Sequence, residues 1–407
     1  MPPDRATTPI SVTSKRPLIS RLCRYAAIRP DDFHQVGTQR KAKVASLGAV
    51  LLTGYSKKSE TAAAESNKVR VGYIGLTCEA SIFSAVENGY FKDEGLDVEL
   101  SKCDWKNYKD TLALGGYDIT QHLVMYFLKP IEQGFDVKFT GGIHTGCLRI
   151  QAAANSGIHS VEDLRGKRIG VPGMGTPPFV YSNRVLKCHG IVGSREIEWK
   201  VFPVGELGLA IDKGEVDAVA DSEPIGSMLL TSSKVRNVAD QAADEGYKDE
   251  YCCEVIANGK WLAANPKTAA AATRALLKGA KRVQTNPAAA AQMSVDKKYL
   301  ASNPKLNAIA RSKLRYIPSV SRAEASVKRA TEEMIAAGML APNTNVAELA
   351  KHAFAHLDGV TDEWIEKTEV KTVAGGHTLP PRDVVTVANI AASKVDTTCC
   401  AKPVATN

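Results

Sequence analysis

The sequence predicts an α/β protein of two similarly built lobes, each a mostly parallel sheet flanked by helices. The first observation is a strand pattern at residues 69–74, followed by a glycine turn and the apolar helical face of Ile82, Phe83 and Val86. The second is the same order at residues 168–186, where a glycine-rich turn separates a short strand from a helix. Strands that alternate with helices favour parallel sheets covered on both faces.

Each half of the sequence also contains a similar short segment after its helices. Residues 114–119 read LGGYDI, and residues 213–219 read KGEVDAV. Because ligands sit beyond the carboxyl ends of parallel strands, the loops at residues 75–79 and 172–176 should face one cleft if the lobes oppose each other. Helix N-termini at these loops would offer unpaired backbone N–H groups to an anionic or strongly polar ligand.

Two apolar runs are expected to link the halves. Residues 147–154 leave the first lobe, and residues 251–257 return from the second. Two such crossovers form a hinge that permits rotation of intact lobes. From Pro266 onward we expect helices that cover the first lobe, with Ser321 and Asn345 starting two of them through capping boxes.

The net charge of +8 does not indicate a nucleic-acid partner. Residues 1–58 hold 11 Lys and Arg against 3 Asp and Glu, so residues 59–407 carry 41 of each sign. A sequence-independent binder of DNA or RNA needs a basic face, and a single basic tail is a poor substitute. We therefore expect no nucleic acid among the partners.

Residues 1–68 are expected to be a signal-like leader and a linker. A basic cluster at residues 40–43 precedes an apolar stretch at residues 44–52, and small polar residues follow, which is the layout of a secretory signal. The protein is therefore expected to be exported, either periplasmic or associated with the cell surface. The alternatives are a disordered basic leader and a misassigned start.

Three phrases carry a resemblance to a known family. Residues 89–98 read GYFKDEGLDV, residues 163–172 read DLRGKRIGVP, and residues 213–218 read KGEVDA. In this order they resemble the substrate-binding proteins of ABC importers, in the branch for nitrate, sulfonate, taurine and thiamine pyrimidines. The resemblance covers residues 69–360 and implies a type II periplasmic-binding (Venus flytrap) fold. It also implies capture of a small solute outside the cytoplasmic membrane and delivery to a permease and its ATPase.

The membrane anchor of this family is in doubt here. The sequence at residues 52–54 reads LTG, which resembles a lipoprotein signal, but Tyr55 stands where the lipid-bearing Cys should follow. Without a thiol no thioether can form. We therefore expect no lipid anchor at this point.

The repeat and the resemblance together divide the chain. We expect the leader at residues 1–68, lobe 1 at 69–150, lobe 2 at 151–254, a helical return to lobe 1 at 255–365, and a partly disordered extension at 366–407. We expect a monomer that closes on its solute.

Ligand contacts are expected from both sides of the cleft, because a solute that contacts one lobe alone cannot favour closure. The candidates are hydroxyls, thiols and imidazoles of the first lobe and a glycine-rich loop, a flexible methionine and a carboxylate of the second. The predicted ligand-binding residues are Thr77, Cys78, His122, His144, Cys147, Met174, Gly175, Thr176 and Glu223. An acid in the cleft argues against a bare anion, so we expect a small polar or heteroaromatic solute.

The cysteines raise the question of a metal. Cys78, Cys147, His122 and His144 could together hold a soft cation. Closely spaced Cys or His pairs of the kind that mark structural zinc sites are absent, so we expect no metal and no cofactor. The adjacent cysteines at residues 252–253 should point to opposite faces of a strand, and one of them could reach the cleft.

An enzyme is the rival class. The fold also resembles that of thiamine-pyrimidine synthases, which use a Cys-rich cluster and pyridoxal phosphate held by a lysine in the cleft. No Lys stands in the predicted cleft loops, and a Schiff-base Lys must be desolvated near the reacting carbonyl. We therefore expect a binding protein and no catalysis. A solute sensor without a transporter is the third class.

Overall fold

The computed structural model describes residues 65–371 apart from residue 233. All of these residues belong to one compact unit of the chain. The leader up to residue 64, Tyr55 within it, and the tail from residue 372 lie outside the described residues. Within the described part, every helix is too short or too polar to cross a bilayer.

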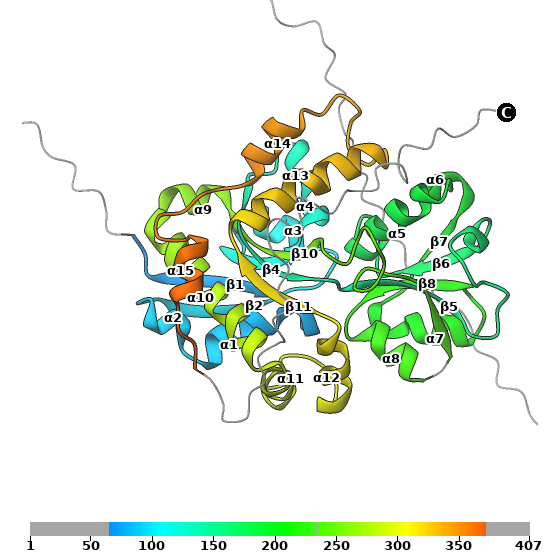
Figure 1. Cartoon of the computed structure of the whole chain (residues 1–407), viewed down its shortest axis with the longest axis horizontal. Coiled ribbons are helices and arrows are strands. Elements are labelled where there is room, and N and C mark those ends of the chain that lie inside the picture. The colour runs from blue at the N-terminus through cyan, green and yellow to red at the C-terminus, as the bar shows by residue number, and fades with distance from the viewer. Residues whose placement is uncertain (1–64, 233, 372–407) are drawn as a thin grey trace, which may run out of the picture. The chain divides into compact units, whose positions relative to one another are not determined.

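The first sheet contains strands from both ends of the described chain, in the order β11-β4-β10-β3-β1-β2 (Figure 1). Its strands are β1 (Lys68–Tyr73), β2 (Asp97–Lys102), β3 (Ile119–Leu123), β4 (Val137–Thr145), β10 (Tyr251–Asn258) and β11 (Arg315–Ser319). Strand β1 pairs in parallel with β2 and β3, whereas β10 pairs antiparallel with β3 and β4. The sheet is therefore mixed.

The second sheet repeats this plan on a smaller scale, in the order β7-β6-β8-β5-β9. Its strands are β5 (Leu148–Ala153), β6 (Arg168–Val171), β7 (Glu198–Val201), β8 (Ala218–Ser222) and β9 (Val235–Asp240). Strand β6 pairs in parallel with β7 and β8, and β5 pairs antiparallel with β8 and β9.

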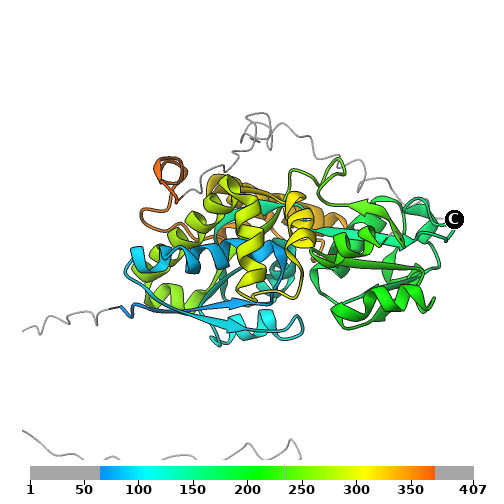
Figure 2. The same ribbon diagram turned by 90° about the horizontal axis from the view of Figure 1, so that it is seen from below.

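Helices flank both sheets (Figures 1 and 2). Those beside the first sheet are α1 (Ala80–Glu87), α2 (Tyr90–Asp93), α3 (Tyr108–Ala113), α4 (Val124–Glu132), α9 (Gly259–Ala264), α10 (Pro266–Thr285), α11 (Pro287–Asp296), α12 (Pro304–Ser312), α13 (Ser321–Ala336), α14 (Val346–Ala353) and α15 (Asp362–Lys367). Those beside the second are α5 (Pro177–Cys188), α6 (Gly193–Glu196), α7 (Leu207–Asp212) and α8 (Ile225–Thr231). Short 3-10 turns are η1 (Thr77–Glu79), η2 (Glu162–Leu164) and η3 (Val204–Glu206). The predicted fold class, α/β with two helix-flanked sheets, is confirmed, but both sheets are mixed rather than mostly parallel, because β10, β11, β5 and β9 pair antiparallel with their neighbours.

The chain passes from the first sheet to the second between Thr145 and Leu148, and it returns through residues 241–250. Gly146, in the first crossover, has a φ of +67°. A Cβ atom there would lie 2.7 Å from the Cβ of Ala242 in the second crossover, so the two crossovers lie against each other. The predicted lobe limits at residues 150 and 254 stay predictions.

Two local expectations were wrong. The region after Pro266 is not all helical, because Arg315–Ser319 forms strand β11 at the edge of the first sheet. Pro318 within this strand lacks an N–H donor, which an edge position tolerates. Ser321 does not cap α13 either: its N–H and that of Val320 donate to the distant carboxylate of Asp362, at 3.2 and 2.6 Å.

The other predicted cap was correct. The side chain of Asn345 accepts a hydrogen bond of 3.1 Å from the backbone N–H of Glu348 at the start of α14. This cap needs only residues within one turn, whereas the Asp362 cap depends on tertiary structure.

Candidate functional site

The backbone of the loop after β1 is hydrogen-bonded to an acidic side chain that directly follows the loop. The carboxylate of Glu79 accepts hydrogen bonds from the backbone N–H groups of Ile74, Gly75 and Leu76, at 2.9, 2.7 and 2.8 Å. Burial raises the pKa of Glu79 to about 7, although these three donors act in the opposite direction. The amides expected to meet a ligand in this loop are therefore already bonded.

Cys78 lies in η1, directly after this loop, with 1% of its surface exposed. Its carbonyl oxygen accepts hydrogen bonds from Gln121 Nε2 and from the Tyr316 hydroxyl, both at 2.5 Å. These two donors come from β3 and β11, which lie apart in the first sheet. The backbone of Cys78 is thus held from two sides, and its thiol lies in the interior.

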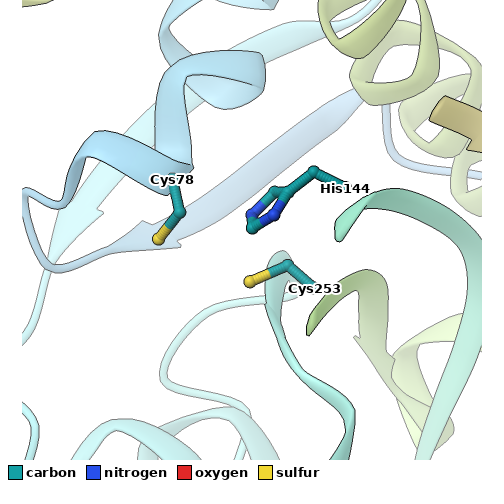
Figure 3. A group of neighbouring side chains, drawn as sticks. All are labelled: Cys78, His144 and Cys253. Atoms are coloured by element: carbon teal, nitrogen blue, oxygen red, sulfur yellow. The ribbon is translucent and has the colours of Figure 1, made fainter. Parts of the chain in front are cut away.

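Cys78, His144 and Cys253 form a buried cluster, which we call the thiol–imidazole cluster (Figure 3). One ligand atom from each lies within 4.8 Å of the others. His144 of β4 and Cys253 of β10 are register partners on neighbouring antiparallel strands, so both side chains project from the same face. Three elements that are distant in sequence therefore bring two sulfurs and an imidazole together.

Two further thiols adjoin the cluster. Cys147 lies in the first crossover and Cys252 in β10, and both thiols are buried. The adjoining thiols of Cys252 and Cys78 lower the pKa of Cys147 well below the ordinary value, against the effect of burial. The adjoining thiols of Cys147 and Cys253 raise the pKa of Cys78 well above the ordinary value. Four thiols thus lie buried in one region and influence one another's protonation.

The imidazole of His144 completes this arrangement. His144 is fully buried, and its Nε2 atom has no hydrogen-bond partner. Its Nδ1 atom lies 3.4 Å from the carbonyl oxygen of Thr145. Burial lowers the pKa of His144, but Cys253, Cys147 and the Thr145 carbonyl together outweigh burial, and the net change is upward.

His122, also predicted to bind the ligand, lies in β3 within a cage of aromatic rings. Its ring centroid lies 4.5 Å from that of Tyr108, 5.1 Å from Tyr126 and 5.4 Å from Trp105. Neither ring nitrogen has a hydrogen-bond partner. Burial lowers the pKa of His122 to about 4, so the ring is neutral at physiological pH.

Thr77 occupies the loop position predicted for it, but its hydroxyl is engaged. It donates a hydrogen bond of 2.7 Å to Oδ1 of Asn307 in α12, and both residues are buried. Any role of Thr77 in ligand binding would require α12 to move.

The second-lobe loop lies at the start of α5. The hydroxyl of Thr176 donates to the carbonyl of Gly173 at 2.6 Å, and the helix begins with Pro177 and Pro178, which have no N–H groups. Met174 is 58% exposed, and Gly175 has a φ of +74° with no atom within 4 Å of a Cβ built there. This loop is the more open of the two.

Glu223 is bound within its own lobe. Its carboxylate forms an ion pair with Arg149 and accepts hydrogen bonds from the N–H and hydroxyl of Ser227, at 3.1 and 2.9 Å. Arg149 also bonds Asp240 at 3.0 Å. Glu223 could therefore bind the predicted solute only if that solute displaced Arg149.

Sequence reasoning missed the supporting residues of this region. Arg149 and Gln121 lie within apolar strands, where a buried polar side chain is itself a signal. The pair of cysteines at residues 252–253 was noted as having one member able to reach the cleft, and Cys253 is the one that joins Cys78 and His144. Tyr316 could not be found, because its strand was not predicted.

A family model described as NMT1/THI5 like matches residues 77–290, which is more than half of the chain. The chain belongs to the NMT1/THI5-like family. The region matched includes all four thiols and the imidazole described above. The predicted resemblance to the substrate-binding branch is confirmed by this match and by the solved structures below.

Two curated proteins represent the relatives of this chain. It is 26% identical over 246 residues to a 4-amino-5-hydroxymethyl-2-methylpyrimidine phosphate synthase of Aspergillus parasiticus, covering 55% of this chain and 68% of the synthase. It is 26% identical over 236 residues to a nitrate import ATP-binding protein of Synechococcus elongatus, covering 53% of this chain and 35% of that protein. The curated proteins similar to this chain thus include a synthase and a component of nitrate import.

Two solved structures similar to this chain are binding proteins by name. The alkanesulfonate-binding protein of Xanthomonas axonopodis pv. citri has a TM-score of 0.58 and 18% identity, covering 70% of this chain and 99% of that one. The nitrate-binding protein of Synechocystis PCC 6803 has a TM-score of 0.59 and 16% identity, covering 71% and 86%. At these identities the likeness establishes the periplasmic-binding fold.

Proposed function

We propose that this NMT1/THI5-like protein is the solute-binding component of an ABC importer that encloses a small polar or heteroaromatic solute between its lobes. The observation that carries the proposal is the pair of adjacent crossovers, where Gly146 lies against Ala242. Two neighbouring segments of this kind allow the lobes to rotate as rigid bodies about one axis. The shared fold with alkanesulfonate- and nitrate-binding proteins supports the same conclusion.

A contact between the lobes supports a stable closed state. Arg184 of α5, beside the second sheet, donates to both carboxylate oxygens of Glu250, at 2.8 and 3.0 Å. Arg184 also forms an ion pair with Glu333 of α13, beside the first sheet. The guanidinium is 2% exposed, so its ion pair with Glu333 is a buried link between helices that flank the two sheets.

The charges favour a neutral or zwitterionic solute over a bare anion. Arg149, the buried guanidinium next to the first crossover, already bonds the carboxylates of Glu223 and Asp240. It therefore has no surplus positive charge to offer nitrate or a sulfonate. A neutral or zwitterionic solute does not require such a charge.

Catalysis of the synthase type is the second candidate, favoured by the curated relatives and by the buried thiols. Pyridoxal phosphate would require a lysine desolvated beside it to form a Schiff base. Among the described residues no lysine is buried. The residues present do not fit that cofactor, so the binding role is the better supported of the two.

We further propose that the protein is exported, acts as a monomer, and delivers its solute to a permease with its ATPase. The periplasmic-binding neighbours and the nitrate importer relative support this assignment. A fusion of the leader to a reporter enzyme that is active only after export tests it. An inactive reporter would contradict export and leave solute binding to be judged separately.

Calorimetry with the full chain tests the proposed binding role. The panel contains aminopyrimidines, alkanesulfonates and nitrate, and we expect a pyrimidine to bind with a decrease in the radius of gyration measured by X-ray scattering. Binding without a change in the radius would contradict closure. A covalent adduct trapped by borohydride after incubation with pyridoxal phosphate would favour the enzyme instead.

A further inference from the structure

We propose that Cys78, His144 and Cys253 bind one thiophilic cation of the Zn²⁺ or Cu⁺ class. This site goes beyond solute binding, and it reverses the expectation of no metal drawn from sequence spacing. Spacing could not reveal it, because the three residues come from η1, β4 and β10 rather than from one short motif.

The separations suit a tetrahedral ion. A zinc–sulfur bond of about 2.3 Å places neighbouring ligand atoms of a tetrahedron roughly 3.8 Å apart. The ligand atoms of the cluster lie within 4.8 Å of one another, so each needs to move inward by only a fraction of an ångström to about one ångström. Figure 3 shows Cys78 on one side of the cluster and His144 and Cys253 on the other, with the two sulfurs and the imidazole as near neighbours.

The identity of the donors selects the class of ion. Thiolate sulfur and imidazole nitrogen are the ligands that Zn²⁺ and Cu⁺ prefer, whereas Mg²⁺ and Ca²⁺ require oxygen. The described residues bring three such ligand atoms together, and a tetrahedral ion with three protein ligands keeps its fourth position for water or another small ligand.

An independent observation also points to a ligand at this position. The Nε2 atom of His144 is buried without a hydrogen-bond partner, which costs free energy unless something binds it. The other ring nitrogen, Nδ1, lies nearest to the Thr145 carbonyl, the type of outer partner that orients a metal-bound histidine. The bonds of Gln121 and Tyr316 to the Cys78 carbonyl position the first ligand in the same way.

Metal binding displaces the thiol protons to solvent and requires no oxidant. The test uses the full chain, reduced and freed of metal with a chelator, and titrated with Co²⁺ as a spectroscopic probe. We expect a thiolate-to-cobalt absorption band that saturates at one ion per chain and disappears when Zn²⁺ is added. Absence of this band would overturn the proposal.

Variants locate the site. Cys78→Ser, Cys253→Ser and His144→Ala should each weaken Co²⁺ binding at least about tenfold. Cys103→Ser is the matched control, because this half-buried thiol lies outside the cluster, with its sulfur 3.6 Å from the Ser101 carbonyl. Cys399→Ser with Cys400→Ser should also keep the band. Loss of the band in the tail variant or in Cys103→Ser would place the ion elsewhere and overturn the assignment.

A second measurement covers variants that fail to fold. In the wild-type chain, Zn²⁺ should protect Cys78 and Cys253 from alkylation more than it protects Cys103, as read by peptide mass spectrometry. Equal alkylation of all three with and without Zn²⁺ would contradict the site. A disulfide within the cluster, seen as a loss of two hydrogens in protein that binds no cation, would identify the thiols as a redox pair instead. Neither result depends on whether a solute binds.

Discussion

Arg70 and Asp118 are joined in the first lobe by a bond network that the second lobe repeats. The backbone N–H of Arg70 donates to Asp118 Oδ2 at 2.8 Å, and its guanidinium donates to both carboxylate oxygens. Arg168 and Asp217 make the same three contacts between β6 and the segment before β8. Each pair links an arginine near the start of a strand to the aspartate of the repeated segment at residues 114–119 or 213–219. The two halves share this sequence pattern because both use the same bond network.

The same Asp-to-Asn substitution should lower the free energy of unfolding by different amounts in these two networks. Asp118→Asn should destabilise the protein by about 1–3 kcal/mol, because a buried carboxylate loses charge-assisted hydrogen bonds. The Asp118 side chain is 7% exposed and that of Asp217 is 28% exposed, so Asp217→Asn should cost less. Urea unfolding of both variants measures the difference. Equal costs would show that burial does not control the strength of the network.

The contact between the lobes predicts a strong interaction at Arg184. Arg184→Met should cost about 3–5 kcal/mol, because it leaves the carboxylate of Glu250 buried and unpaired. The double variant Arg184→Met with Glu250→Gln should recover part of this loss. Lys367→Met serves as control, since its pair with Glu363 is 75% exposed on both sides and should contribute less than about 1 kcal/mol. Chemical denaturation of the wild type, Arg184→Met, Glu250→Gln and the double variant gives the interaction energy, and additive losses would contradict a direct Arg184–Glu250 bond.

The aromatic cage predicts a pH dependence of stability. Burial lowers the pKa of His122 to about 4, while an unfolded histidine titrates near 6.5. Between these values the unfolded chain binds a proton that the folded chain does not, so stability falls as pH decreases from about 6.5 to 4, by up to about 3 kcal/mol.

A comparison of variants isolates this effect. His122→Phe should remove that part of the pH dependence, whereas replacement of the exposed His356 by Gln should leave it unchanged. Thermal unfolding across the pH range provides the measurement. An unchanged slope in His122→Phe would show that another group titrates.

The hinge predicts a steric effect at Gly146. Gly146→Ala should destabilise the protein through its φ of +67°, by about 1–2 kcal/mol, and through the contact with Ala242, by roughly 1–3 kcal/mol more. Gly190 has a φ of +71° with open space around it, so Gly190→Ala carries the conformational cost alone. The difference between the two unfolding free energies measures how closely the crossovers pack. If it is zero, the crossovers are free to separate.

The sequence alone predicted the plan of the fold. The strand of residues 168–171, the helix beginning at Pro177 and the cap of α14 at Asn345 appear where expected. Each of these depends on residues close together in the chain, such as alternating apolar side chains or a capping side chain three residues away. The resemblance added the arrangement of the two lobes.

The sequence could not determine the partners of the predicted site residues. Glu223, Thr77 and the amides before Glu79 were identified by position, yet each is bonded within its own lobe. The cap of α13 comes from Asp362, on a separate helix. A loop position follows from local sequence, but the availability of a side chain depends on what the rest of the chain places beside it.

What the sequence by itself determined is therefore the repeated α/β plan and the family, because both follow from short phrases in a constant order. Only the tertiary structure decided that Cys253 lies with Cys78 and His144. The reason is the strand order of the first sheet, in which β10 lies between β3 and β4. This position brings Cys253, which comes late in the chain, close to the segment that follows β1. Strand order is set by long-range pairing, and no local pattern in one sequence encodes it.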